Sequence, residues 1–473
     1  MNPSLLTEES ALFVDLRDVE ARENIVHEYH PATRCSGGPV LAQDRPWERH
    51  PGMTASVIFD PEERLFKAWY MAGCYAPNRN HVQCLATSED GVHWEKAPLR
   101  LHSALGSVEN NIVIPADYHD GQAHWESMLK DPCDSDPARR YKALGWSSLD
   151  WDGPLSGIYT ATSPDGMRWE PTPEPVFRHH PRPGTPDLGP VGDAQALMLD
   201  SRRRRAVAYL RGTDRSRMFS ESADFMHWSP PKPFLYPLHD DETLYNNVGF
   251  VYGNQYLGFL THFDRNAYQQ TQTLQLLTSR DGDRWLRAPA SAPLIGLGEL
   301  AEWDRFQIML TGAPPIQFRG QLHIYYRGTN RRHAKILREF EPRLSCDQDP
   351  SRMSIGLARI RVDGFASIGG SFDGGVLLTR PYVLQGDHLV VNHKSDHGQM
   401  QVELLDEAKQ PVAGWTREDC VPLCADRIDE PVVWKHCRPL SALQGRPVRL
   451  RFLLWNARLY SYRTAPEPAE CTE

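Results

Sequence analysis

Short runs of apolar or alternating apolar and polar residues, bounded by turn residues, follow one another along most of this chain. Four of them lie at residues 64–73 (RLFKAWYMAG), 140–146 (RYKALGW), 205–212 (RAVAYLRG) and 255–263 (QYLGFLTHF). Runs of this length with alternation are typical of β-strands. Two further runs, at 321–328 and 353–365, have the same character. The pattern therefore predicts an all-β protein.

A seven-residue motif, Ser-x-Asp-Gly-x-x-Trp, follows each of the first four runs. It occurs as SEDGVHW at 88–94, SPDGMRW at 163–169 and SRDGDRW at 279–285, with a weaker copy, SADFMHW, at 222–228. Asp-Gly between strands is a hairpin signal, and the Trp can pack under a neighbouring unit. We interpret the four aspartates of the motif as turn residues. They are Asp90, Asp165, Asp224 and Asp281.

Self-similarity at intervals of tens of residues is typical of folds that repeat one unit of strands. The runs at 321–328 and 353–365 add a fifth unit that lacks the motif. Four strands per unit and five units predict a five-bladed β-propeller over residues 1–366. Residues 375–463 contain a second series of short strands without helical period, which predicts a β-sandwich domain, and the polar residues 464–473 are predicted to be a disordered tail.

Composition narrows the choice of partner and compartment. The net charge is −9, and the only basic cluster, at 202–205, lies between two strand candidates, so nucleic acid is not expected as a partner. The amino terminus resembles no signal peptide and no run reaches transmembrane length, which predicts a cytoplasmic protein without membrane contact. The nine cysteines are interpreted as free thiols. A zinc site at Cys420, Cys424, Cys437 and His436 is the less favoured alternative.

Several segments carry a family resemblance. The opening LFVDLRDVEARENIVHEYHPA, then PVLAQDRPWE, Lys130-Asp131-Pro132 and GVLLTRPYVLQGDHLVVN resemble bacterial proteins related to glycoside hydrolase families 32 and 43. The resemblance implies a propeller with an axial funnel that acts on a small carbohydrate or glycoside through carboxylates at the starts of the innermost strands. We predict no cofactor, apart from a structural divalent ion that the propeller axis could hold.

Hydrolysis of a glycosidic bond uses one protonated carboxyl group and one carboxylate. Four acids fall at similar places before the first strand of a unit, namely Asp131, Asp193, Glu242 and Asp304. We predict Glu242 as the acid and Asp193 as the nucleophile or base. Asp131 resembles the family 32 aspartate that stabilises the transition state, because it stands in a Lys-Asp-Pro sequence. A turn or capping role is the alternative for each acid, and Glu126, Glu299 and Glu302 are nearby candidates.

The chain departs from family 32 at two places. Where that family has an Asn-Asp-Pro-Asn-type motif, the segment HPGMTASVIFD has no acid until Asp60 at the far end of the strand, and only Asp44 and Glu48 precede it. Gly192-Asp193 stands where that family has Glu-Cys. Predicted ligand-binding residues are His50, Arg211, Tyr245, Trp303, Arg327 and His333. The two arginines keep a phosphorylase open as an alternative because they could bind phosphate. A non-catalytic carbohydrate-binding protein is the third hypothesis.

Overall fold

The computed structural model describes residues 4–35, 37–48, 53–72, 81–115, 123–147, 156–178, 194–212, 215–265, 270–289, 292–299, 301–333, 353–436, 439–443 and 445–466. This part of the chain is almost entirely β-structure, as predicted. Its helical turns are two short 3-10 helices, η2 (Pro137–Arg139) and η3 (Leu440–Leu443). No helix in it is long and apolar enough to span a membrane.

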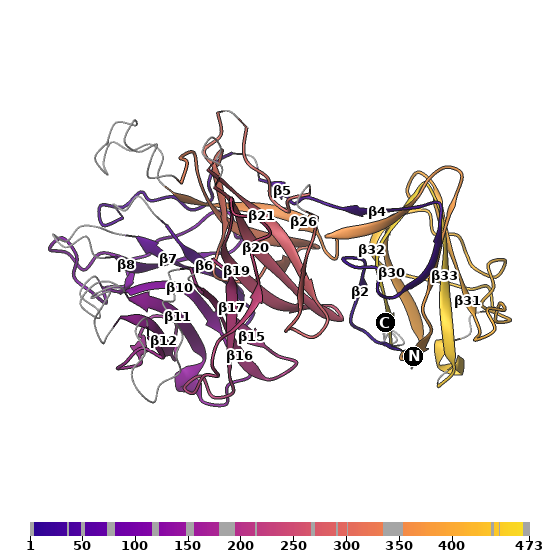
Figure 1. Ribbon diagram of the computed structural model, residues 1–473, viewed down its shortest axis with the longest axis horizontal. Coiled ribbons are helices and arrows are strands. Elements are labelled where there is room, and N and C mark those ends of the chain that lie inside the picture. Colours follow the sequence, from indigo (N-terminus) through magenta and orange to yellow (C-terminus); the bar gives the residue numbers. More distant parts are fainter. Residues whose placement is uncertain are drawn as a thin grey trace, which may run out of the picture.

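Residues from 55 to 361 form a propeller lobe of four sheets (Figure 1). The first contains β6 (Ala55–Asp60), β7 (Leu65–Ala72), β8 (Val82–Ser88) and β9 (Ile112–Ile114). The second contains β10 (Ala123–Lys130), β11 (Tyr141–Ser147), β12 (Gly157–Ser163), β13 (Glu170–Pro171) and β14 (Phe177–Arg178). The third contains β15 (Ala196–Asp200), β16 (Arg205–Arg211), β17 (Arg217–Ser222) and β18 (Lys232–Leu235).

The fourth sheet joins two groups of strands. One group is β19 (Glu242–Tyr252), β20 (Gln255–Asp264), β21 (Thr271–Ser279) and β22 (Trp285–Arg287). The other is β23 (Gln307–Leu310), β24 (Ile316–Phe318), β25 (Gln321–Thr329), β26 (Ser354–Arg361) and the amino-terminal β5 (Thr33–Arg34). A single parallel pair, Gln272 with Gln307, connects the groups. The blade count of five stays a prediction, because these two groups share one sheet.

Apolar side chains join each group of strands to the next. Trp69 of β7 packs on Tyr141 of β11, with ring centroids 5.7 Å apart. Tyr325 of β25 belongs to the same buried cluster as Phe66 of β7, so the last group contacts the first. Since burial of apolar surface is the main favourable term in folding, these interfaces hold the ring of sheets closed.

The second lobe consists of two six-stranded sheets around one apolar core. One sheet contains β1 (Ser4–Leu6), β29 (Tyr382–Leu384), β33 (Pro447–Trp455), β28 (Gly375–Thr379), β3 (Val19–Glu23) and β31 (Gln399–Leu405). The other contains β32 (Asp426–Pro431), β30 (His388–Lys394), β34 (Ala457–Ala465), β27 (Ala366–Gly370), β4 (Ile25–Tyr29) and β2 (Ala11–Leu12).

The pairing of the amino-terminal strands differs from the sequence-based domain assignment. Strands β1 to β4 were expected in the propeller with the rest of residues 1–366, but they pair with carboxy-terminal strands, and Figure 1 shows indigo β2 and β4 among orange and yellow neighbours. Strands that are distant in sequence pair through backbone hydrogen bonds, and this pairing leaves no local sequence pattern. The sequence therefore could not show to which lobe β1 to β4 belong. The predicted tail also begins too early, because Thr464 is still paired with Leu389 in β34.

The repeated motif forms the expected hairpin turns. In the first copy, the Asp90 Oδ1 accepts hydrogen bonds from the backbone N–H groups of Val92 and His93, both at 2.8 Å. The Ser88 Oγ accepts from the Gly91 N–H at 2.9 Å, and Gly91 has a φ of 74°. The other copies repeat the aspartate contacts. The motif aspartates therefore have the turn role predicted from the sequence.

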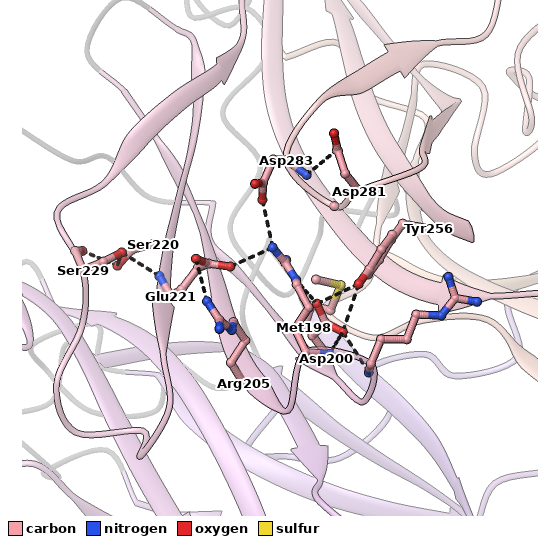
Figure 2. Close-up of polar contacts among 12 residues, drawn as sticks. Met198, Asp200, Arg205, Ser220, Glu221, Ser229, Tyr256, Asp281 and Asp283 are labelled. Atoms are coloured by element: carbon pink, nitrogen blue, oxygen red, sulfur yellow. Dashed lines mark hydrogen bonds and ion pairs between the residues drawn. The ribbon is translucent and has the colours of Figure 1, made fainter. Parts of the chain in front are cut away.

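Charged residues around the motif tie the third group of strands to the fourth (Figure 2). The Arg203 guanidinium forms ion pairs with Asp200 at 2.5 Å, with Asp283 at 2.8 Å and with Glu221 at 3.0 Å. The Tyr256 hydroxyl donates to Asp200 as well, at 3.2 Å. Asp283 lies directly after the motif glycine. This turn therefore also connects the third group of strands to the fourth, a contact that the sequence motif alone does not predict.

His323 gives the propeller a titratable group in an apolar setting. It is 3% exposed, stacks on Phe66 with ring centroids 6.0 Å apart, and lies 5.6 Å from Phe318. Burial, with Arg359 and Arg319 nearby, lowers the pKa of His323 from 6.5 to about 4. The folded state thus holds neutral imidazole at pH values where the unfolded chain takes up a proton.

The lowered pKa predicts an acid-dependent loss of stability. As pH falls from about 6.5 to about 4, only the unfolded state gains this proton, so the free energy of unfolding drops by up to about 3 kcal/mol. We expect His323→Phe, which keeps the ring packing, to lose less stability than the wild type between neutral pH and pH 4.5 in urea unfolding. His239→Phe, at an exposed side chain, is the matched control and should keep the wild-type pH slope.

Candidate functional site

The first strand of each group begins at the same end of the propeller, called here the mouth. Around the axis, the Ser56 Oγ donates to the Glu126 carbonyl at 3.2 Å, and the Ser127 Oγ accepts from the Leu197 N–H at 3.0 Å. Gly312, just after β23, packs against the same strands near the axis. A Cβ there would lie 1.8 Å from the Glu126 carbonyl oxygen, so only glycine fits. First strands β6, β10, β15 and the end of β23 thus converge on one axis.

Two β-bulges occur near the mouth, in β10 and β19. The register of β10 with β11 shifts between Trp125 and Ser127, and that of β19 with β20 shifts between Leu244 and Asn246. A bulge leaves one residue unpaired and redirects its side chain, and bulges are enriched beside active sites. The unpaired residues are Glu126 and Tyr245, both partly exposed. The Glu126 Oε2 accepts a hydrogen bond of 3.0 Å from the Gln195 N–H.

A buried arginine fixes the backbone at two of these strand starts. Arg217 is fully buried, and its guanidinium donates to the Ala194 carbonyl at 3.0 Å, the Tyr245 carbonyl at 3.0 Å and the Asn247 Oδ1 at 2.7 Å. Ala194 has a φ of 72°, a conformation uncommon for residues other than glycine and often found at functional sites. Arg217 therefore holds the start of β15 against the bulge in β19.

Aromatic and imidazole side chains gather in two places near the mouth. Tyr245 and His333 have ring centroids 5.3 Å apart, and the Arg211 guanidinium lies 5.8 Å from the Tyr245 ring centroid. In the first two groups, His124 lies 4.1 Å from His81 and 5.2 Å from Trp146, again between ring centroids. Partly exposed rings of this kind can pack against the C–H face of a sugar while polar neighbours bind its hydroxyl groups.

Several buried amides near the mouth retain an oxygen without a hydrogen-bond donor in the described residues. They are the Oε1 atoms of Gln195, Gln272 and Gln307 and the Oδ1 atom of Asn246. Each side chain is at most 3% exposed. Because a buried acceptor without a partner costs about 1–3 kcal/mol, donors such as water or ligand hydroxyl groups are expected beside them.

Asp131 does not lie at the mouth. It follows the last residue of β10, whereas Glu126 lies in the first half of that strand, and it pairs with Lys142. Its Oδ1 accepts from the Cys133 N–H at 2.9 Å within the turn to β11. The Lys-Asp-Pro resemblance therefore points to a turn, and Glu126, in the same sequence stretch, is the acid that the strand places at the mouth.

Glu242 begins β19 but is held as an ion. It is 3% exposed and contacts His262 at 3.0 Å and the Arg287 Nη1 at 3.1 Å. Burial alone would raise the pKa of Glu242, but hydrogen bonds from His262 and Arg287 outweigh it and hold that pKa well below 4.5. A group that donates a proton to a leaving oxygen needs a raised pKa. This setting therefore opposes the predicted role of general acid.

Asp304 belongs to a structural ion pair. It is 1% exposed, pairs with the Arg34 Nη1 at 2.8 Å and accepts a hydrogen bond of 2.7 Å from the Tyr326 hydroxyl. Arg34 lies in β5, so Asp304 fastens the amino-terminal strand to the last group. Trp303 stacks on Tyr326 with ring centroids 5.9 Å apart, which is a packing contact for one face of its ring, and its role in sugar binding stays a prediction.

The remaining predicted residues divide by position. Arg211 and Arg327 lie at the mouth ends of the second strands β16 and β25, as the sequence predicted, although Arg327 is only 6% exposed. Tyr245 and His333 are in contact, as described above. Asp193 and His50 lie outside the described residues. The structure thus brings Tyr245, Arg211 and His333 together, places Asp131 at the other end of β10, and engages Asp304 with Arg34 and Tyr326.

No group of three or more His, Cys, Asp or Glu side chains in the described ranges could hold a metal ion. Cys420 is buried and Cys424 is exposed, while Cys437, the third cysteine of the alternative zinc site, lies outside those ranges.

Comparison with solved structures shows the same type of fold in other proteins. One, described as a glycoside hydrolase, is 13% identical with a TM-score of 0.50, and the match covers 70% of this chain and 92% of that one. Another belongs to work on the GH130 family of mannoside phosphorylases, which "contains glycoside hydrolases that target beta-1,2 mannosidic linkages in Candida mannan"; it is 11% identical with a TM-score of 0.49 over 71% and 94%. A glycosyl hydrolase from Bacteroides ovatus is 12% identical with a TM-score of 0.48 over 70% and 94%. No family model and no curated protein matches the sequence.

Proposed function

We propose that this protein cleaves or transfers a glycosyl unit of a small carbohydrate bound at the mouth of the propeller. The observation that carries the proposal is the bulge at Glu126, which leaves a partly exposed carboxylate in the first half of β10, and this carboxylate accepts a hydrogen bond from the Gln195 N–H. The fold that the chain shares with a glycoside hydrolase supports it.

A second carboxyl group is needed for this chemistry, and Asp193 is our candidate. It directly precedes Ala194, whose carbonyl oxygen is held by Arg217, and it is two residues from Gln195. One of the two acids would protonate the leaving oxygen while the other attacks the anomeric carbon or activates water. Glu126 replaces Glu242 and Asp131 in this scheme because it alone of the three combines partial exposure with a position at the mouth.

Phosphorolysis is the second candidate, and the arrangement of Arg211 and His333 around Tyr245 favours it. Their side chains lie on one aromatic ring at the mouth, and a guanidinium is well suited to bind phosphate. In this reaction phosphate would take the place of the attacking water.

A screen of aryl glycosides and oligosaccharides, run with and without inorganic phosphate, tests the proposal. Release of free sugar without phosphate would establish hydrolysis, and a sugar phosphate formed only with phosphate would establish phosphorolysis. Binding of sugars without turnover under both conditions would leave a carbohydrate-binding protein and contradict the catalytic proposal.

A further inference from the structure

A cavity of about 600 Å³ opens at the end of the propeller opposite the mouth. Its walls include residues from the second halves of first strands, among them Ile58 of β6, Leu129 of β10, Leu199 of β15 and Phe250 of β19. Its volume falls in the range of small-molecule sites, which are mostly apolar with a few polar groups. It lies apart from Glu126 and Tyr245, because these belong to the first halves of β10 and β19.

The cavity adjoins the one motif copy that departs from the pattern. The other three copies place Gly91, Gly166 and Gly282 in the turn with φ values of 74°, 73° and 80°. The third unit has Phe225 there instead, with a φ of 65° and 2% exposure, and this residue lines the cavity. A bulky side chain in the left-handed region is a true outlier, so surrounding contacts must stabilise it.

The Phe225 ring replaces an aromatic ring that other units take from a neighbouring strand. Between the first and second units, Trp69 of β7 donates to the Gly166 carbonyl at 2.6 Å. In β11 the matching sequence is Lys142-Ala143-Leu144, where β7 has Lys67-Ala68-Trp69. Leu144 therefore stands in place of Trp69, and β11 supplies no aromatic ring to the third unit at this position. Phe225 supplies it from the turn and lies 5.7 Å from the Trp228 ring. The interface is thus built differently at this one place, and the cavity lies beside it.

The carboxylates in the cavity wall already have cationic or hydroxyl partners. Asp131 and Asp134 pair with Lys142, and Asp200 pairs with Arg203 and accepts from the Tyr256 hydroxyl, as Figure 2 shows for Tyr256 and Asp200. These groups are therefore not available to bind a cationic ligand.

The wall carries exposed charges of both signs, but its exposed carboxylates already have partners. Glu62 pairs with Lys130 and Arg140, and Asp224 contacts His227.

Arg204 lines the cavity, is exposed, and has no hydrogen bond or ion pair from its side chain to any described residue. Arg205 beside it is 41% exposed and pairs with Glu221, as Figure 2 shows. A guanidinium at the edge of an apolar cavity favours an anionic group at that position.

We propose that this cavity is a second ligand site, for a small organic anion with an apolar, ring-containing body. The ring of the ligand would lie along the partly exposed Ile58 and Leu199, and its anionic group would contact Arg204. This site is independent of the carbohydrate chemistry at the mouth, since no residue is shared between them.

Titration of the full chain with anilinonaphthalene sulfonate, a fluorescent anion of this chemistry, tests the proposal. We expect saturable binding of one equivalent, weakened about tenfold by Arg204→Ala, which removes one charge-assisted contact. Arg64→Ala is the matched control, because Arg64 is an exposed arginine at the same turn position of the first unit, with a φ of 55° against 53° for Arg204. It should bind the probe as the wild type does.

Native cysteines supply a second measurement. Cys133 lines the cavity and is exposed, whereas the exposed Cys424 lies in the other lobe. The probe should slow alkylation of Cys133, mapped by mass spectrometry, without changing that of Cys424. Binding that is absent, or that persists unchanged in Arg204→Ala with Cys133 unprotected, would overturn the proposal.

Discussion

Replacement of Glu126 by glutamine is expected to lower turnover of any substrate found in the glycoside screen by about a thousandfold, the usual cost of losing an acid or base. The amide cannot exchange the proton that cleavage of a glycosidic bond requires. In the wild type the Gln195 N–H donates to the Glu126 carboxylate at 3.0 Å, and the amide oxygen of the variant can still accept this hydrogen bond. The bulge and the fold should therefore persist, and KM should change much less than kcat.

The matched control lies at the other end of the same strand. Asp131→Asn changes the same chemical group, and Lys142 keeps its second partner, Asp134, at 2.9 Å. This variant should retain nearly full turnover. Steady-state kinetics on both variants, with circular dichroism as a check of folding, would decide between the two acids. If Glu126→Gln were active and Asp131→Asn inactive, the catalytic role would belong to Asp131 of the Lys-Asp-Pro sequence and not to Glu126.

The two acids show why sequence could locate the site only approximately. The motif and the strand runs identified the β-strands and the unit boundaries, because hairpin turns and alternation are local. Glu126 and Asp131 are five residues apart in one acidic stretch, and which of them faces the mouth depends on where β10 begins. No turn signal marks that start, since the bulge at Glu126 is visible only in pairing with β11.

Other parts of the arrangement depend on contacts distant in sequence. Asp304 has the strand-entry position expected of a catalytic acid, but its partner, Arg34, is 270 residues away. Glu242 likewise contacts Arg287, which lies three strands further along the chain in β22. A carboxylate in either setting has the same sequence appearance as a catalytic one, because its cation is supplied by tertiary structure.

Removal of the Asp60 carboxylate is expected to have the largest effect on stability. Asp60 ends β6, is fully buried, and accepts from the Lys67 Nζ at 3.1 Å, the Lys130 Nζ at 2.8 Å and the Tyr141 hydroxyl at 2.9 Å. The last two lie in β10 and β11, so this one carboxylate joins the first group of strands to the second. Asp60→Ala would leave two nearly buried ammonium groups without their shared partner, at a cost of about 3–5 kcal/mol.

Glu63→Ala provides the control, because Glu63 contacts the same Lys67 Nζ at 2.7 Å but is 54% exposed. An exposed ion pair is worth at most about 1 kcal/mol, so this variant should unfold in urea close to the wild-type midpoint.

Burial would raise the pKa of Asp60, but hydrogen bonds from Lys130, Tyr141 and Lys67 hold this pKa well below 3.8. The stability that Asp60 contributes is therefore fully present above about pH 4 and is lost as pH falls toward the lowered pKa. The difference in the free energy of unfolding between wild type and Asp60→Ala should be constant from pH 5 to 8 and should become smaller below that range. Equal losses of unfolding free energy in Asp60→Ala and Glu63→Ala would contradict the central role assigned to the buried carboxylate.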